Sequence, residues 1–159
     1  MEYAYQTFSS PVGLLHIYAD HSGLKHISFD EALSIKTLPP NSLTRSAHLE
    51  LEGYFLGEIK EFKVPLNPDG SDFQKDVWSF LQGIPYGKTT SYQTIAQLIG
   101  GKEKVRAVAS ANSKNPIPII IPCHRVIGKD GELTGYSGGL QRKEALLALE
   151  SGELQGRLF

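Results

Sequence analysis

A thiol and an imidazole stand side by side in Pro122-Cys123-His124-Arg125, which holds the only cysteine of the 159 residues. A thiol is a strong nucleophile only as thiolate, and a basic or proton-accepting neighbour such as His124 or Arg125 favours that form. A lone cysteine is usually just a small buried apolar residue, and it is these neighbours that suggest chemistry. Adjacent residues of a strand point to opposite faces, so we do not expect His124 to take the thiol proton directly. Either a bridging water or a local bend of the chain at Pro122 would be needed.

The thiol lies within an apolar run that predicts a short buried strand. The run contains three successive isoleucines at 119–121 and continues after the thiol with Val126-Ile127. Pro122 interrupts it, because proline cannot donate to a sheet ladder and fixes its own φ. We therefore expect Cys123 at a bend where the strand meets a pocket.

Two short helices joined by glycines are predicted ahead of this run. Ser91 is a good N-cap for a helix from Tyr92 to Ile99, which Gly100-Gly101 ends. A second helix is predicted over residues 102–113. This spacing is typical of a helix-turn-helix, although a plain helical hairpin has the same pattern.

The second helix separates into two faces. The buried side contains Val105, Val108, Ala109 and Asn112. The exposed side contains Arg106, Ala107, Ser110, Ala111 and Lys114. A helix is about 10–12 Å wide with its side chains, and the minor groove of DNA is about 6 Å wide. Only a helix face of small residues could therefore approach the walls of that groove. Long base-reading side chains are scarce, which disfavours a transcription regulator and favours sequence-independent binding.

The order of these motifs resembles the O6-alkylguanine-DNA alkyltransferases, also called methylated-DNA–protein-cysteine methyltransferases. The similarity runs from Ser91-Tyr92-Gln93 and Asn115-Pro116 through the cysteine motif to Gly135-Tyr136-Ser137-Gly138-Gly139 and Glu150. It covers the second half of the chain, while the first half matches only in general character. The resemblance implies single-use DNA repair: after base flipping, a methyl or larger alkyl group moves irreversibly from guanine O6 to Cys123. Thymine O4 is a second candidate donor.

The resemblance also implies catalytic roles. Cys123 attacks the alkyl carbon, Glu150 orients His124, and His124 draws the thiol proton through a water. Tyr136 donates a proton or hydrogen bond to the guanine ring. Asn115 would act as a hinge between two backbone segments. Without the resemblance, the spacing of Glu150 alone would not mark it as a functional residue.

Further residues are implied in binding the substrate and the duplex. Pro118 forms an apolar wall, the Ser137 N–H supports O6, and the carbonyls of Val126 and Cys123 accept from the exocyclic amine. The partner is double-stranded DNA containing O6-alkylguanine, with the second helix in its minor groove. Tyr92 crowds a phosphate, Arg106 fills the gap left by the flipped base, and the helix lies in the groove through Ala107, Ser110 and Ala111. From the residues alone, Arg106 would be a phosphate contact or a solvated charge, and Tyr92 would be a core ring.

The first half predicts a strand meander followed by a helix. Strands are expected at 3–9, 14–19 and 24–29, a helix at 42–56 and a further strand at 61–66. Asn67-Pro68-Asp69-Gly70 predicts a domain boundary. We therefore expect an α+β protein with a sheet-and-helix domain at 1–70 and a mainly helical alkyltransferase domain at 71–159.

Composition narrows the possibilities further. The net charge is −1, but basic residues outnumber acidic ones only in the second half, which mildly favours a nucleic-acid face there. One cysteine excludes an intrachain disulfide and a multi-cysteine zinc site, and the remaining histidines lack ligand spacing, so we expect neither metal nor cofactor. No stretch is long enough to span a membrane and no signal peptide is evident. We expect a cytoplasmic monomer.

Two other functions fit part of the pattern. An alkyltransferase-like protein that binds damaged DNA without transfer would lack the acceptor cysteine, whereas Cys123 is present. A cysteine hydrolase could use Cys123, His124 and Glu150, but adjacent cysteine and histidine are poorly placed for a direct dyad and no oxyanion motif is evident.

Overall fold

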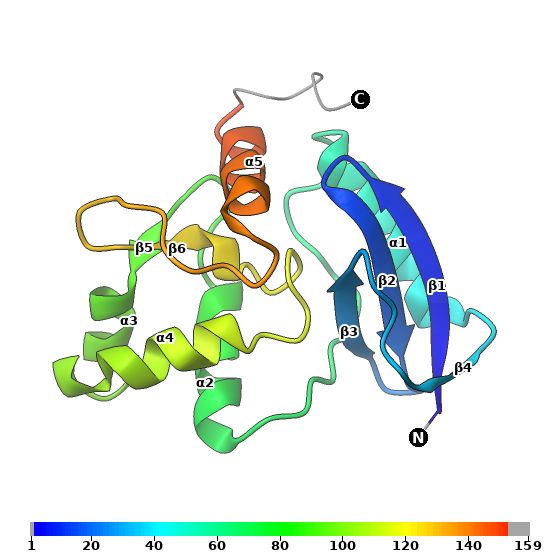
Figure 1. Ribbon diagram of the computed structural model, residues 1–159, viewed down its shortest axis with the longest axis horizontal. Coiled ribbons are helices and arrows are strands. Elements are labelled where there is room, and N and C mark those ends of the chain that lie inside the picture. Colours follow the sequence, from blue (N-terminus) through cyan, green and yellow to red (C-terminus); the bar gives the residue numbers. More distant parts are fainter. Residues whose placement is uncertain (1, 153–159) are drawn as a thin grey trace.

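Four strands form the N-terminal sheet of the computed structural model, which describes residues 2–152 (Figure 1). They are Glu2–Ser10 (β1), Gly13–Ala19 (β2), Leu24–Phe29 (β3) and Lys36–Leu38 (β4). β1, β2 and β3 form an antiparallel meander and β4 pairs parallel to β1, so the strand order is β3-β2-β1-β4. The meander matches the three predicted strands, and β4 lies in a segment for which no strand was predicted.

One long helix, α1 (Ser42–Phe55), covers a face of this sheet (Figure 1). Asn41 caps it, because its side chain accepts hydrogen bonds from the backbone N–H of Leu43 and Thr44. The helix packs through buried aromatic residues, and the rings of Phe8 and Phe55 lie 6.3 Å apart between centroids. The predicted strand at 61–66 is wrong, since this part of the chain forms only an isolated bridge to β3 at its end.

The helical domain contains α2 (Asp72–Gln82), α3 (Tyr92–Ile99), α4 (Val105–Ser113) and α5 (Leu140–Glu150). Two-residue strands, Thr90–Ser91 (β5) and Val126–Ile127 (β6), pair in parallel, and 3₁₀ turns occur at Lys102–Lys104 and Cys123–Arg125. Ser71 and Ser91 cap α2 and α3. The predicted α+β class, with a small sheet domain before a helical domain, is confirmed. A domain boundary between residues 70 and 71 stays a prediction.

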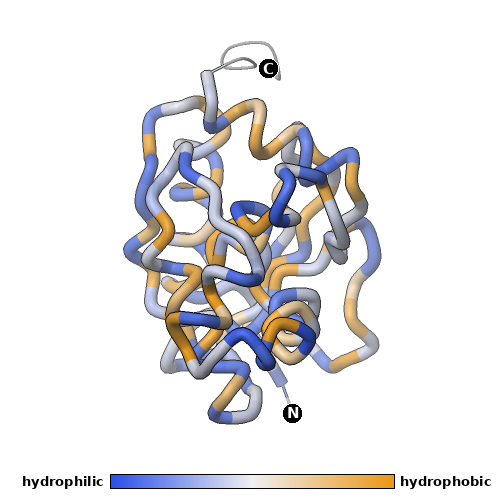
Figure 2. The backbone as a smooth tube through the Cα atoms, turned by 90° about the vertical axis from the view of Figure 1, so that its left-hand side faces the viewer, coloured by the Kyte–Doolittle hydropathy of each residue, from blue (hydrophilic) through white to orange (hydrophobic). Residues whose placement is uncertain are grey.

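The two domains are held together by polar contacts as well as by a shared apolar core. The backbone N–H of Ile27 in β3 donates to the carbonyl of Pro116 at 2.9 Å. Arg142 of α5 donates through Nε to the carbonyl of Val12 at 2.6 Å and pairs with Asp30. Figure 2 shows how apolar and polar stretches alternate along the backbone of both domains.

The predicted strand at Ile119–Ile121 is wrong, although all three isoleucines are buried. The segment turns instead: Ile119 has a φ of 74°, and the N–H of Ile121 donates to the carbonyl of Ile117 at 2.9 Å. A positive φ is unusual for a β-branched residue, so the surrounding packing must hold it there. The physical reason for the missing strand is the lack of backbone donors at Pro116, Pro118 and Pro122.

Candidate active site

Cys123 begins a 3₁₀ turn in the interior of the helical domain and is 2% exposed. Asn115 ties this turn to the preceding chain. Its Nδ2 donates to the carbonyl of Ile121 at 2.8 Å, and its Oδ1 accepts from the N–H of Ile117 at 2.9 Å. The Asn115 side chain also lies close enough to the Cys123 thiol to act on its pKa. The predicted hinge residue therefore lies beside the predicted nucleophile.

Burial raises the pKa of the Cys123 thiol to about 11, although the Asn115 side chain and the positive charge of Lys143 both act to lower it. The sulfur is thus a protonated thiol at neutral pH. Arg125 follows the thiol in sequence, yet its guanidinium pairs with Glu150 instead of activating the sulfur. A separate proton acceptor is needed before the sulfur can attack.

His124 is fully buried and offers such an acceptor. Its Nε2 lies 2.7 Å from Oε2 of Glu150. An ionised carboxylate can only accept, so Nε2 must carry the proton and Nδ1 of the neutral ring must be the acceptor. Nδ1 is buried without a hydrogen-bond partner in the described chain. Burial lowers the pKa of His124, although Glu150 acts to raise it. Because the net shift is downward, the ring is neutral at neutral pH.

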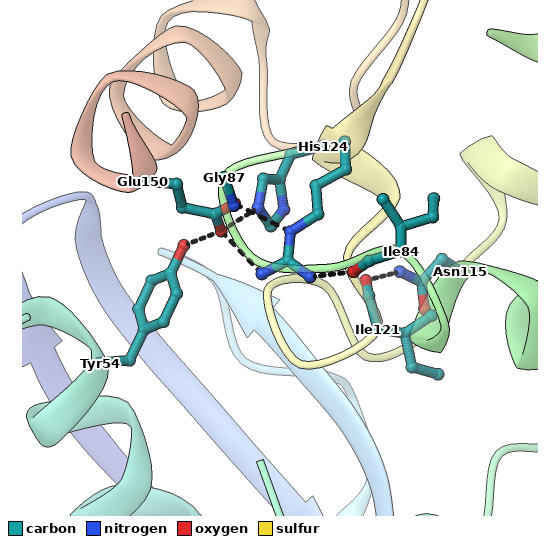
Figure 3. Close-up of polar contacts among 8 residues, drawn as sticks. Tyr54, Ile84, Gly87, Asn115, Ile121, His124 and Glu150 are labelled. Carbon is teal, nitrogen blue, oxygen red and sulfur yellow. Dashed lines mark hydrogen bonds and ion pairs between the residues drawn. The ribbon is translucent and has the colours of Figure 1, made fainter. Parts of the chain in front are cut away.

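Glu150 lies at the end of α5 and accepts from several donors (Figure 3). Arg125 donates through Nε to Oε1 at 2.8 Å and through Nη2 to Oε2 at 3.0 Å. The N–H of Gly87 donates to Oε1 at 3.2 Å, and the hydroxyl of Tyr54 donates to Oε2 at 2.6 Å. Burial alone would raise the pKa of Glu150, but the bonds from His124 and Arg125 outweigh it and lower this pKa to about 2. The buried carboxylate is therefore charged.

Tyr136 lies close to the thiol. Burial and the neighbouring Cys123 raise the pKa of Tyr136 well above its ordinary value, so its hydroxyl keeps its proton. This hydroxyl is buried and has no hydrogen-bond partner in the described chain. The ring contacts Phe29 of β3 with 6.2 Å between centroids. An unpaired buried donor beside a nucleophile could serve a ligand that enters the site.

Three predicted substrate residues meet in one pocket of about 320 Å³ between β3 and the segment after α4. They are Asn115, Pro118 and Ser137, and Phe29 completes the wall from the sheet domain. Cys123 does not itself line this pocket, but Asn115 lines it and lies beside the thiol. The structure therefore brings together residues that lie more than twenty positions apart in the sequence.

Sequence reasoning missed Lys143, which is fully buried next to the site. Its Nζ donates to the carbonyl of Val126 at 2.6 Å and to that of Thr134 at 2.7 Å. Val126 was expected to present this carbonyl to the base, and a carbonyl oxygen can accept a second hydrogen bond. Lys143 precedes Glu150 by two helical turns and so shares its face of α5, which is the signal that could have revealed it.

Replacing Lys143 with methionine should destabilise the protein by about 2 kcal/mol, because two buried carbonyls lose a charged donor. Methionine keeps the length and apolar character of the side chain. Urea unfolding followed by circular dichroism measures the change, with the exposed Lys129→Met as the matched control. Equal stability of the two variants would contradict the structural role of this ammonium group.

The helix-turn-helix is formed by α3 and α4. Arg106, Ala107 and Ser110 are exposed on α4, as the sequence predicted. Tyr92, at the start of α3, is partly buried, and its hydroxyl lies 3.4 Å from the carbonyl of Thr134. The turn uses Gly101 at a φ of 122°, a conformation that favours glycine.

The predicted exposure of Ala111 is wrong, because Ala111 is 2% exposed. It faces α2, where Nε1 of Trp78 donates to its carbonyl at 2.9 Å. Trp78 is itself a core residue. Both faces of α4 contain small residues, so the sequence alone placed Ala111 on the wrong side.

The described residues 2–152 show neither a metal-binding cluster nor a membrane-spanning helix. No cluster of three or more histidine, cysteine, aspartate or glutamate side chains within this range is arranged to hold a metal ion. Within the same range, no helix combines the length and the apolar character needed to cross a membrane.

Comparison with known proteins gives a consistent result. The model of the "6-O-methylguanine DNA methyltransferase, DNA binding domain" matches residues 72–152, and that of the "ribonuclease-like domain" of the same family matches residues 3–68. The methylated-DNA–protein-cysteine methyltransferase of Methanosarcina acetivorans is 47% identical over 151 residues, covering 92% of this chain and 97% of that protein. The crystal structure of the Mycobacterium tuberculosis O6-methylguanine methyltransferase is 44% identical with a TM-score of 0.85, covering 95% of this chain and 94% of that one.

A further structure, of Mycobacterium tuberculosis OGT in complex with DNA, is also 44% identical with a TM-score of 0.85 and covers 96% of this chain and 94% of that one. The family models span nearly all of the described residues, and the curated relative matches along almost its whole length. The resemblance found in the second half of the sequence therefore extends to the first. The chain belongs to the 6-O-methylguanine DNA methyltransferase family.

Proposed function

We propose that this protein repairs DNA directly, by moving the alkyl group of O6-alkylguanine onto Sγ of Cys123. Family membership supports this activity, and one observation of the site carries the mechanism. A buried thiol lies beside a neutral histidine whose Nε2 is held by Glu150 and whose Nδ1 has no partner in the described chain. A thiol, a base and a group that orients the base are the parts that an activated cysteine needs.

The proposed reaction is a single displacement. A water passes the thiol proton to Nδ1 of His124, and a lone pair of Sγ attacks the alkyl carbon. The new C–S bond forms as the bond from that carbon to guanine O6 breaks, and its electron pair remains on the guanine. The guanine takes up one proton, so the thiol hydrogen formally replaces the alkyl group. No metal or cofactor enters this balance.

The residues around the pocket would stabilise the leaving guanine. Tyr136 keeps its proton and can donate it or a hydrogen bond to the ring, while the N–H of Ser137 supports O6. Pro118 would form the apolar wall beside the alkyl group. The carbonyls of Cys123 and Val126 would accept from the exocyclic amine. Donors aimed at the place where charge develops are the usual source of such stabilisation.

We propose that double-stranded DNA is bound with α4 in the minor groove. The small exposed residues Ala107 and Ser110 allow the helix backbone to approach the groove walls. Because Cys123 is buried, the target base must leave the stack to reach it. The exposed Arg106 would fill the vacated space, and Tyr92 would press on the adjoining phosphate. Ala111 is buried against α2, so its part is to support the helix from behind.

Replacing Ser110 with phenylalanine should weaken binding to duplex DNA by at least about tenfold, because the ring holds α4 away from the groove walls. Fluorescence anisotropy with a labelled duplex at fixed salt measures the affinity. Ser46→Phe makes the same change on the exposed face of α1 and should bind as the unchanged protein does. Unchanged affinity of the Ser110 variant would refute the proposed docking of α4.

The stoichiometry of the reaction tests the proposed function. The product is a thioether, which water does not hydrolyse, so each chain should accept one alkyl group and then stop. Intact-mass spectrometry after incubation with excess O6-methylguanine duplex should show one added methyl group, with one guanine restored per chain. Several restored guanines per chain would overturn the proposal, and DNA binding without a mass change would favour an alkyltransferase-like damage-binding protein.

The same measurement with an O4-methylthymine duplex tests the second candidate donor. We also propose that the protein acts as a cytoplasmic monomer. One chain contains both the nucleophile and its proton acceptor, and a free thiol persists in a reducing compartment.

A further inference from the structure

The sheet domain contacts the Glu150–His124 pair through a single phenol. Tyr54 lies in the last turn of α1 and is fully buried. Its hydroxyl donates to Oε2 of Glu150 at 2.6 Å, joining residues 96 positions apart (Figure 3). Figure 3 shows the tyrosine approaching the carboxylate from α1, opposite the 3₁₀ turn that provides the histidine. The other donors to this carboxylate, Arg125, His124 and Gly87, all belong to the helical domain.

The oxygen that Tyr54 contacts is the one that holds the histidine. His124 Nε2 lies 2.7 Å from Oε2, and the phenol shares this acceptor at a similar distance. The position of Oε2 fixes the direction of the imidazole and hence of Nδ1. A donor that holds Oε2 therefore acts on the proton acceptor through one intermediate group.

Tyr54 is itself held firmly. Its ring packs against Phe55, Phe62 and Tyr86 at centroid distances of 5.2, 5.4 and 6.1 Å. Burial and the charge of Glu150 raise the pKa of Tyr54 well above its ordinary value, so the hydroxyl remains a donor at every working pH. The phenol also compensates a carboxylate that sits unfavourably at the C-terminal end of a helix.

We propose that Tyr54 is a positioning residue for alkyl transfer, holding Oε2 of Glu150 so that His124 presents Nδ1 toward the thiol. This rests on the proposed function of Cys123, His124 and Glu150. It gives the sheet domain a direct part in the chemistry, because that domain provides the phenol. A phenol that only stabilised the fold would leave the chemistry of the histidine unchanged.

The two roles differ in their dependence on pH. Removing the hydroxyl leaves Oε2 with fewer donors, which makes the carboxylate a stronger acceptor for His124 and favours the protonated ring. Because only the neutral ring can take the thiol proton, the rate falls at low pH as His124 becomes protonated. This fall in the pH profile, its acid limb, should therefore move to higher pH. The titratable and charged groups that act on this histidine and carboxylate are Arg125, Lys143, Tyr54 and Tyr136, and Tyr86 and Cys123 act in turn on Tyr54 and Tyr136. Only the phenol of Tyr54 is altered in the test.

The test compares Tyr54→Phe with Tyr5→Phe. The hydroxyl of Tyr5 in β1 also makes a hydrogen bond of 2.6 Å, but to His16 within the sheet domain. Tyr5→Phe therefore removes a comparable hydrogen bond and leaves the contacts of Glu150 and His124 unchanged. Single-turnover transfer from an O6-methylguanine duplex is measured from pH 5 to 9 on protein shown to be folded by circular dichroism. We expect Tyr54→Phe to transfer about tenfold more slowly at pH 7 with its acid limb at higher pH, and Tyr5→Phe to match the unchanged protein.

A second readout does not depend on transfer. The pH titration of the His124 ring by NMR should move to higher pH in Tyr54→Phe and stay in place in Tyr5→Phe. An unchanged rate and titration, or a slower rate with both pH midpoints in place, would overturn the role of Tyr54. Should the unchanged protein fail to accept a methyl group, the proposed function fails, and the role of Tyr54 in alkyl transfer fails with it. The His124 titration then tests only whether Tyr54 acts on His124 through Glu150.

Discussion

A protein carrying Cys123→Ala should bind alkylated DNA with unchanged affinity and accept no alkyl group. The thiol is the only cysteine of the chain, and it directly precedes His124, whose Nε2 is held by Glu150. Alanine removes the nucleophile while keeping the 3₁₀ turn, at a packing cost of about 1 kcal/mol for the lost sulfur. The expected loss is complete, because no other group at the site combines nucleophilicity with the position of Sγ.

Two measurements on one sample check this result. Intact mass after incubation with an O6-methylguanine duplex should show no added methyl group. Fluorescence anisotropy with the same duplex should give the same affinity as that of the unchanged protein. Cys123→Ser tests the nature of the nucleophile, since a hydroxyl of similar shape is far less reactive than a thiol. A methyl group found on the alanine variant, for instance on His124 or Lys143, would show that the acceptor had been assigned wrongly.

The helices of the second half could be predicted from local signals. Ser71 and Ser91 mark the starts of α2 and α3 because their hydroxyls accept from the backbone N–H three residues later. Glycines end α3, and the spacing of apolar residues sets the buried face of each helix. These features depend on a few neighbouring residues, which is why the sequence alone reveals them.

The turn before the thiol could not be predicted in the same way. Its isoleucines are as buried as those of a strand, and burial is what an apolar run reports. The conformation is decided by the surrounding prolines and by Asn115, whose side chain replaces the backbone bonds of a sheet. The exposed and buried sides of α4 are both lined by small residues, so Ala111 gave no reliable signal either.

The contacts around Glu150 lie beyond any local pattern. Arg125 and His124 are adjacent in sequence, yet both turn toward a carboxylate about 25 residues away. Tyr54 comes from the other domain and fits an ordinary apolar helix position. The family resemblance named Glu150 and His124, whereas only the structure reveals that the sheet domain and Arg125 share the same acceptor.

Replacing His124 with glutamine should slow alkyl transfer at pH 7 by about 10²- to 10⁴-fold, the usual contribution of a positioned base. The pKa of the thiol is about 11, so at pH 7 only about one sulfur in ten thousand is ionised without help. The neutral histidine removes this limitation by taking the proton during the attack. Glutamine can still donate to Glu150 through its amide, so the carboxylate is not left without that partner.

The pH profile distinguishes loss of the base from general damage. The pKa of His124 is lowered by burial, so the ring is neutral above its ordinary value near 6.5 and the rate of the unchanged protein should be flat from pH 7 to 9. Without the base, the rate depends on the small thiolate fraction and should rise about tenfold per pH unit over the same range. The defect of His124→Gln should therefore shrink as the pH increases.

Single-turnover kinetics at saturating protein measure both profiles, so that changes in DNA affinity do not enter the rate. His21→Gln makes the same substitution in the exposed turn between β2 and β3 and should behave as the unchanged protein does. A flat profile in His124→Gln would mean that another group takes the proton. A rising profile in the unchanged protein would mean that the buried thiol ionises on its own, in which case the contacts of Glu150 would serve the fold alone.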